Sequence, residues 1–262
     1  MKTVARRIVD GAMLHLIKMW LEAPVEETDE RGNTHRSTRN RDEGRGTPQG
    51  APISPLLSNL YMRRFVLGWK TLGYETRLRA YIVNYADDLV ILVDGHPQQA
   101  WLLRAVDRRL REELAKLDLT LNEAKSRVVD LTKGEAFGFL GFTFRRLRSK
   151  RGKWWAQITP AGKRRAGLLR KLKEVFRRWD SQPVGQVIAE INPILRGWVD
   201  YFRIGNATRC FEFVRDWVGK KVRRHLMRAK NRSGFGWRRW SRAWLYETLG
   251  LFDDYRVTWG RA

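Results

Sequence analysis

The sequence predicts an α+β fold in which antiparallel hairpins packed with helices are followed by an all-α bundle. Three observations lead to this prediction. Within residues 81–93, two apolar, β-branched runs flank a polar break, which is the pattern of a buried hairpin. Residues 137–158 show a second, aromatic-rich strand pattern. From residue 159 onwards, apolar residues recur every three or four positions, as they do on one face of a helix.

The chain begins with a broad apolar stripe at helical spacing. We expect one helix that runs to about Glu22, because the following residues fall on one face: Val4, Ile8, Ala12, Leu16 and Trp20. Residues 26–45 are polar and contain glycine and many charges, which predicts an exposed loop or a small hairpin.

A second helix is expected from Pro55 to about Trp69, with Ser54 as its N-cap and Pro55 at its first position. The central hairpin comes next, and a helix near residues 97–117 follows it. The apolar face of that helix is predicted to be Leu102, Leu103, Val106, Leu110 and Leu114.

The second half of the chain changes from strand to helix. We interpret residues 137–158 as one hairpin with its turn near residues 149–152. Thr159 and Pro160 then predict the cap and first-turn proline of a helix. Two further helices are expected at about residues 184–201 and 208–230. The spaced positions of the first helix are Arg165, Leu169, Leu172, Phe176 and Trp179.

Asp87 and Asp88 lie between the two apolar runs of the central hairpin. Carboxylates beside an apolar sheet are costly unless a cation neutralises them. Magnesium prefers oxygen ligands and keeps coordination positions for phosphate, so it is the natural partner. The alternative is a pair of solvated turn residues. The apolar runs on both sides of the pair, and a second motif upstream, favour the metal.

The upstream motif is a Gly/Pro loop at residues 46–55. Glycine lets backbone N–H groups approach a ligand closely, and proline stiffens the path of the loop. Taken alone, this segment also reads as an ordinary junction between a loop and a helix.

The two motifs in this order resemble the reverse transcriptases, in particular those encoded by group II introns. The resemblance rests on Pro48-Gln49-Gly50 followed by Ser54-Pro55, and on Tyr85-Ala86-Asp87-Asp88. Further blocks extend it over essentially the whole chain. Residues 121–127 resemble the next family block, residues 137–144 the primer-gripping strand, and residues 195–206 the maturase-specific thumb domain.

The resemblance implies an RNA-directed DNA polymerase and group II intron maturase that binds intron RNA, assists splicing and copies the RNA into DNA with Mg²⁺. Asp87 and Asp88 would be catalytic metal ligands. Tyr85 and Ala86 would contact the substrate, and Lys125 either neutralises the leaving group or is a surface lysine. The residues implied to shape the template and nucleotide pocket are Pro48, Gln49 and Gly50.

The resemblance also implies a division into a partial palm, residues 1–158, and a maturase thumb with a basic C-terminal region, residues 159–262.

The family uses a third aspartate on a strand upstream of the Pro-Gln-Gly loop. Here Asp10 is the only aspartate ahead of the acidic loop, and it lies in a helical pattern. We therefore expect a truncated or split copy that cannot polymerise efficiently alone. Its partners would be intron RNA, a DNA target or primer, dNTPs and an N-terminal fingers/palm fragment. The alternative is a non-catalytic splicing factor.

The charge of the chain favours a nucleic-acid partner. Lys and Arg number 52 against 28 Asp and Glu, a formal net charge of +24. Residues 133–262 carry 31 basic and 10 acidic side chains, and they hold nine of the 12 tryptophans. Interleaved arginines and aromatic rings suit RNA, although a solvated basic surface that serves solubility is the alternative. The RNA-binding candidates are Arg164, Arg165, Arg170, Lys171, Arg223 and Arg224.

Other features bound the compartment. Cys210 is the single cysteine and cannot form an internal disulfide. No Cys/His cluster has zinc spacing, which predicts that the optional endonuclease of the family is missing. Apolar runs are too short for a membrane span, and the N-terminal segment carries charges throughout, unlike a signal peptide. We expect a cytoplasmic, nucleic-acid-associated protein with no membrane partner.

Overall fold

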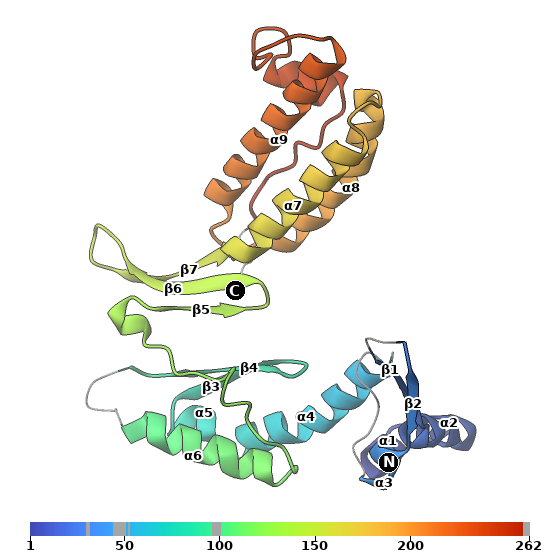
Figure 1. The fold of residues 1–262 in the computed structure, drawn as a ribbon. Coiled ribbons are helices and arrows are strands. Elements are labelled where there is room, and N and C mark those ends of the chain that lie inside the picture. Colours follow the sequence, from blue (N-terminus) through green and yellow to red (C-terminus); the bar gives the residue numbers. More distant parts are fainter. Residues whose placement is uncertain (30–31, 44–50, 52, 96–100, 259–262) are drawn as a thin grey trace. The chain divides into compact units, whose positions relative to one another are not determined.

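The computed structural model describes residues 1–29, 32–43, 51, 53–95 and 101–258 (Figure 1). The chain divides into two compact units, Met1–Arg127 and Val128–Ala262. Both units combine helices with small antiparallel sheets, so the α+β prediction is confirmed. In the described part of the chain, no helix has both the length and the apolar character that crossing a membrane would require.

The N-terminal segment forms two helices rather than the single one expected. Helix α1 covers Lys2–Ala5 and α2 covers Gly11–Glu22. The break between them ends at Asp10, whose carboxylate caps α2 by accepting hydrogen bonds from the backbone N–H groups of Ala12 at 2.8 Å and Met13 at 3.2 Å. Asp10 therefore has a structural role that explains its presence at this position.

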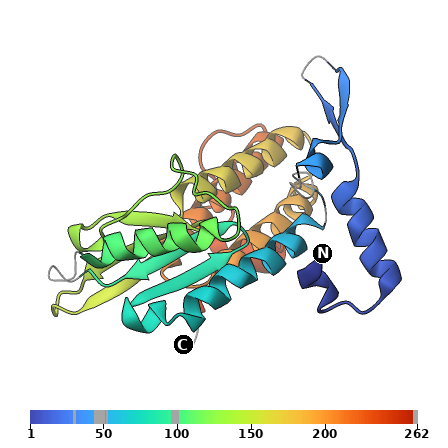
Figure 2. The ribbon, with the colours of Figure 1, turned by 90° about the horizontal axis from the view of Figure 1, so that it is seen from below.

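The polar segment after α2 contains the small hairpin expected there. Strands β1 (Val25–Thr28) and β2 (Thr34–Ser37) pair antiparallel in a sheet of their own, and α3 (Arg39–Asp42) follows (Figure 2). The Pro-Gln-Gly residues Pro48, Gln49 and Gly50 lie outside the described residues.

The remaining elements of this unit follow the predicted order. They are α4 (Ser54–Thr71), α5 (Tyr74–Arg77), β3 (Ala80–Tyr85), β4 (Asp88–Val93) and α6 (Trp101–Ala115). The predicted N-cap is wrong, because Ser54 is the first residue of α4 and the capping position belongs to Ile53, whose side chain makes no capping hydrogen bond.

Helices α4 and α6 cover one face of the β3–β4 hairpin (Figure 1). Trp69 of α4 is fully buried, and its indole N–H donates a 2.9 Å hydrogen bond to the carbonyl of Ala80 in β3. Val106 and Leu114 of α6 join the same core. Leu103 was expected on that face as well, but it is 46 % exposed because it points away from the hairpin side of α6.

The second unit opens with a short 3₁₀ turn, Leu131–Lys133, and a sheet. Its strands are β5 (Ala136–Phe139), β6 (Phe142–Arg148) and β7 (Trp154–Pro160), paired antiparallel in the order β5-β6-β7. The expectation of one hairpin is therefore incomplete. The turn predicted near residues 149–152 is present, and a second tight turn is made by Leu140 and Gly141, whose φ angles are +49° and +79°.

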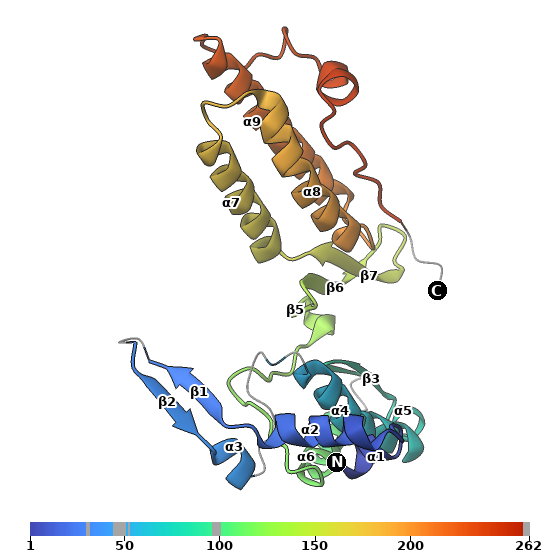
Figure 3. The ribbon, with the colours of Figure 1, turned by 90° about the vertical axis from the view of Figure 1, so that its right-hand side faces the viewer.

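Three long helices follow the sheet: α7 (Gly162–Arg178), α8 (Val184–Phe202) and α9 (Thr208–Ala229). Figure 3 shows them side by side. A five-residue π-helix, Trp244–Thr248, lies further along the chain. The predicted start of α7 is wrong, since Thr159 and Pro160 still pair with β6 as the end of β7, and Ala161 takes the capping position.

The bundle encloses a continuous apolar core. On α7 the buried residues are Leu168, Leu172 and Phe176, so the buried face is turned slightly from the one predicted through Arg165 and Leu169. Helix α8 contributes a stripe at spacings of three and four, and α9 contributes a second one. The fully buried members of these stripes are Val187, Ile191, Leu195, Val199, Val214, Val218 and Val222.

The loop between α8 and α9 joins the helices to the sheet. The backbone N–H of Asn206 donates to the carbonyl of Ile158 in β7 at 2.7 Å, and the side-chain oxygen of Asn206 accepts from the N–H of Ile158 at 3.0 Å. Gly205 adopts a φ of +83°, and a Cβ there would lie 2.8 Å from the carbonyl oxygen of Ile158. Glycine is thus required both for the turn and for the close approach.

The boundary between the compact units falls after Arg127, so residues 128–158 pack as part of the helical unit. The division at residue 158, which the family resemblance implies, differs from this packing boundary and stays a prediction.

We predict that Leu195→Ala lowers the free energy of unfolding by about 2–5 kcal/mol, because it removes fully buried methyl groups and leaves a cavity. Urea unfolding monitored by far-ultraviolet circular dichroism measures the change. The control is Arg196→Ala, the exposed next residue, which should shift stability by no more than about 0.5 kcal/mol. Equal effects of the two substitutions would contradict the assigned core.

Candidate functional site

The two aspartates lie at the tip of the β3–β4 hairpin. Tyr85 pairs with Asp88, so Ala86 and Asp87 form a two-residue turn. Ala86 has a φ of +53°, in the left-handed region that side chains disfavour. The turn is held from inside by Asn84, whose side-chain NH₂ donates to the carbonyl of Ala86 at 2.9 Å and, more weakly, to that of Asp88 at 3.5 Å.

The two faces of this hairpin differ in character. Ile82 and Leu89 face the core formed with α4 and α6. On the opposite face Tyr81, Val83 and Tyr85 are 57 %, 45 % and 63 % exposed. Residues paired across an antiparallel ladder share a face, so Asp88 lies beside Tyr85 on the open side. The structure therefore brings together one predicted metal ligand and one predicted substrate contact.

The aspartates are available to a cation. Both are exposed, and neither forms an ion pair with a described residue. In the described part of the chain, no three His, Cys, Asp or Glu side chains gather as a ready-made metal site. A pair of carboxylates nevertheless fits a divalent ion that takes its other ligands from water and from substrate phosphates.

The other predicted site residues are dispersed. Lys125 lies in a turn after α6, where its N–H donates to the carbonyl of Asn122 at 3.0 Å. Its side chain is exposed and forms no ion pair with Asp87 or Asp88. The predicted pocket residues Pro48, Gln49 and Gly50 are outside the described part of the chain.

Most of the predicted RNA-binding residues are accessible on the helical unit. Arg164, Arg170 and Lys171 are exposed on α7, and Arg224 is exposed on α9. Arg165 is half-buried, with its guanidinium 4.8 Å from the ring centroid of Phe213.

Arg223 is different because it is part of the interior. It is 3 % exposed, its Nε donates a 2.8 Å hydrogen bond to the carbonyl of Trp240, and its guanidinium lies 4.1 Å from the ring centroid of Trp237. Burial lowers the pKa of its guanidinium. These contacts commit Arg223 to the fold, so it has no place in a surface that contacts RNA directly.

The predicted residue Arg224 belongs to a group of cations on α7 and α9 whose other members, Lys173, Lys221 and Arg228, were not among the RNA-binding candidates. Burial, and then the positive charges of Arg224, Lys173 and Arg228, lower the pKa of the Lys221 ammonium. We call these four residues the cation cluster. Arg228 also pairs with Asp180, which offsets part of the charge. The signal in the sequence is the spacing of residues 221, 224 and 228, which share one helix face.

The positive charges around Lys221 favour the binding of an anion, because an anion would offset the repulsion that helps to lower the pKa of Lys221. The cation cluster is therefore a candidate site for phosphate groups, which nucleic acids present in series.

Comparison with known proteins gives two family matches. Residues 2–144, more than half of the chain, match the family described as reverse transcriptase (RNA-dependent DNA polymerase). Residues 165–244 match the one described as group II intron, maturase-specific domain. The chain belongs to the group II intron reverse transcriptase/maturase family. The first match contains the β3–β4 hairpin and the second contains α8, α9 and most of α7, including the cation cluster.

A curated relative of this family member is Protein YkfC of Escherichia coli (strain K12), which is 31 % identical over 180 residues. The match covers 58 % of this chain and 44 % of that protein, so the chain matches less than half of its relative's length.

We predict that Asn84→Ala loosens the turn that carries the aspartates. The substitution removes a 2.9 Å hydrogen bond, which contributes about 1 kcal/mol, so backbone amides of residues 80–93 should exchange with deuterium about fivefold faster. Hydrogen exchange measured by mass spectrometry tests this. Val83→Thr, an exposed change on the same strand, is the control, and equal exchange in Asn84→Ala and wild type would show that Asn84 does not hold the turn.

Proposed function

We propose that this chain acts in RNA-directed DNA synthesis and as a group II intron maturase: it binds intron RNA, assists splicing and takes part in copying the RNA into DNA. The observation that carries the proposal is the exposed Asp87–Asp88 turn beside Tyr85, in one chain with a basic helical unit that matches the maturase-specific domain. In this proposal residues 1–158 act as the palm and residues 159–262 as the thumb and RNA-binding region.

Magnesium is the ion that we assign to the aspartate turn. Asp87 and Asp88 would hold it together with phosphate oxygens, and the ion would neutralise charge on the reacting phosphates during nucleotidyl transfer. Tyr85 is proposed to position the sugar or base of the substrate, a role supported by its pairing with Asp88 on the open face. Lys125 is proposed to neutralise the leaving group. The loop at Pro48–Gly50 is proposed to shape the nucleotide pocket.

A two-carboxylate site holds its ion weakly until a substrate or a further ligand arrives. The β3–β4 pair is a sheet of only two strands among the described residues, so its outer edges have no partner strand there. Both facts support an additional partner for polymerisation, a fingers/palm fragment that supplies a strand and a carboxylate.

The maturase role requires no chemistry from the protein. Exposed Arg164, Arg170 and Lys171, together with the cation cluster, offer a series of charges for the phosphates of the intron RNA. The rigid apolar core below them keeps these charges in fixed positions, so that the RNA is held in one conformation.

A second candidate is a splicing factor without polymerase activity. It is favoured by the absence, among the described residues, of any group of three potential metal ligands. Under this alternative the helical unit keeps its role and the aspartate turn has none.

We predict that the double variant Asp87→Asn/Asp88→Asn separates the two roles. It removes both carboxylates without changing side-chain size, so magnesium-dependent extension of a DNA primer on an RNA template should fall by about 100-fold or more. Affinity for intron RNA and support of splicing should stay within about twofold, because the cation cluster is untouched. Asp118→Asn, an exposed carboxylate outside the turn, is the control.

The assay is run on the chain alone and with a fingers/palm fragment of a reverse transcriptase of this family. Extension by neither preparation, with splicing support intact, would establish the splicing factor instead. Loss of RNA affinity in the double variant would contradict the division of roles between the two units.

We also predict that Lys221→Gln reduces the salt dependence of RNA binding. If Lys221 contacts one phosphate, the slope of log affinity against log salt concentration should become shallower by about 1. The control is Lys133→Gln, because Lys133 is already paired with Asp130. Fluorescence anisotropy with labelled intron RNA between low and moderate salt measures both slopes, and identical slopes for Lys221→Gln and wild type would remove Lys221 from the RNA surface.

A further inference from the structure

The segment after α9 carries aromatic and basic residues that have no role in the proposed function. Its path is fixed by two glycines, Gly234 with a φ of +101° and Gly236 with a φ of +73°. A Cβ at Gly236 would lie 2.8 Å from the ring of Trp240, so only glycine allows the loop to pack so closely there. The loop conformation is thus set before any ligand binds.

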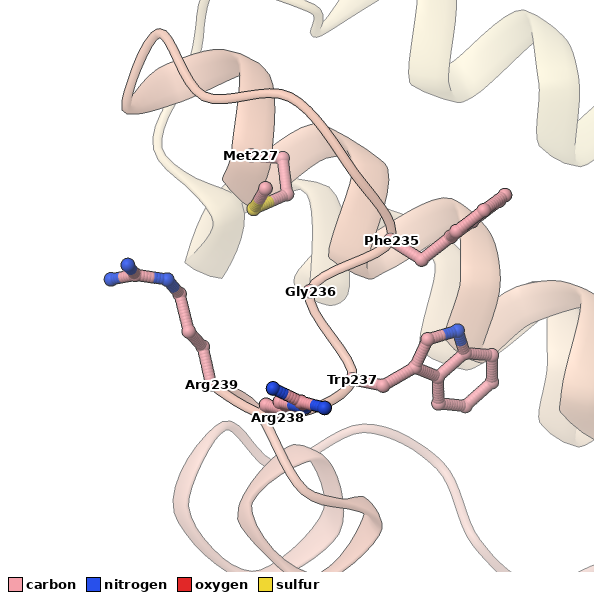
Figure 4. A pocket seen from close by; sticks show the side chains of 6 residues that line it. All are labelled: Met227, Phe235, Gly236, Trp237, Arg238 and Arg239. Carbon is pink, nitrogen blue, oxygen red and sulfur yellow. The ribbon is translucent and has the colours of Figure 1, made fainter.

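Figure 4 shows how the side chains leave this loop. Phe235 and Trp237 project to the same side, while Met227 and Arg239 lie on the other side of the backbone. Phe235 is 60 % exposed and Trp237 is 46 % exposed. Two large rings therefore project to one side of the loop with much of their surface in contact with water.

Each ring lies close to the guanidinium group of an arginine on α9. The guanidinium of Arg223 lies 4.1 Å from the ring centroid of Trp237, and that of Arg224 lies 5.8 Å from the ring centroid of Phe235. Arg223 is itself buried and hydrogen-bonded to the carbonyl of Trp240, which holds its guanidinium beside the ring of Trp237. Trp237 is consequently held in place on one side by a fixed cation and remains accessible on the rest of its surface.

Positive charge lies close to the ring of Phe235. Arg224, which contacts the ring of Phe235, is also a member of the cation cluster with Lys173, Lys221 and Arg228. The loop itself adds two further positive residues, Arg238 and Arg239, directly after Trp237 in the sequence. A ligand that fits both features has a flat apolar ring and a phosphate a few bonds away, which describes a nucleotide.

We propose that Phe235 and Trp237 form a stacking platform for unpaired bases of the RNA, next to the cation cluster that holds the neighbouring phosphates. The inference rests on the proposed RNA-binding function and adds a preference to it. A base in a duplex has both faces covered and cannot reach a protein ring, so the platform selects loops, bulges and single strands.

The test compares two RNA oligomers with equal numbers of phosphates. One is an oligouridylate of about 12 nucleotides, within the size range of single-strand sites, and the other has the same backbone with abasic positions throughout. Fluorescence anisotropy gives the affinity of the full chain for each. Stacking of a base on an aromatic ring strengthens binding about tenfold, so the wild-type protein should prefer the oligouridylate by at least about that factor.

Substitutions then locate the preference. Trp237→Ala should reduce the preference for the oligouridylate over the abasic oligomer to within about twofold. Trp237→Phe should keep most of this preference, because a ring remains. Phe235→Ala provides an independent variant that leaves Arg223 covered by Trp237. The matched control is Phe213→Ala, because Phe213 is also 46 % exposed beneath an arginine but lies outside the loop. Circular dichroism verifies that each variant is folded.

The outcomes separate this inference from the proposed function. Equal binding of the two oligomers by the wild-type protein overturns the platform and leaves the phosphate contacts intact. No measurable binding of either oligomer counts against the RNA-binding function itself. A preference that survives both Trp237→Ala and Phe235→Ala also overturns the platform, and the exposed rings would then belong to a contact with another protein.

Discussion

The helical unit depends on an apolar core that outweighs the repulsion between the charges above it. Side chains such as Leu195 and Val214 are completely buried, and each contributes about 1.5–3 kcal/mol. Like charges one helical turn apart oppose folding by only a few tenths of a kcal/mol per pair. The core therefore tolerates a dense positive surface, in which burial first, and then the charges of Arg224, Lys173 and Arg228, lower the pKa of Lys221.

The aspartate turn, by contrast, is exposed. There a small two-stranded sheet is anchored on one face by Trp69 and the helices α4 and α6, and it leaves its other face open to water. The acidic tip is positioned by backbone pairing and by the Asn84 side chain rather than by burial. The helical unit thus carries its positive charge on a packed core, whereas the hairpin presents its two carboxylates at an exposed turn.

Periodicity was enough to predict the long elements, because α8 and α9 bury clear apolar stripes and the β3–β4 hairpin has a polar break between two apolar runs. It failed where one residue decides the outcome. The cap at Asp10, the tight turn at Leu140 and Gly141, and the continuation of β7 through Pro160 depend on local hydrogen bonds that leave no periodic signal. Arg223 and Arg224 are alike in sequence, yet a rotation of about 100° around α9 buries one and exposes the other.

The contact between Gly205 and Ile158 also has a mechanical consequence. Two hydrogen bonds and a position too narrow for any Cβ fasten the last strand of the sheet to the connection between two long helices. Displacing β7 therefore pulls on α8 and α9 together. The sheet and the bundle are joined directly at this connection, so a change in the position of one requires an adjustment in the other.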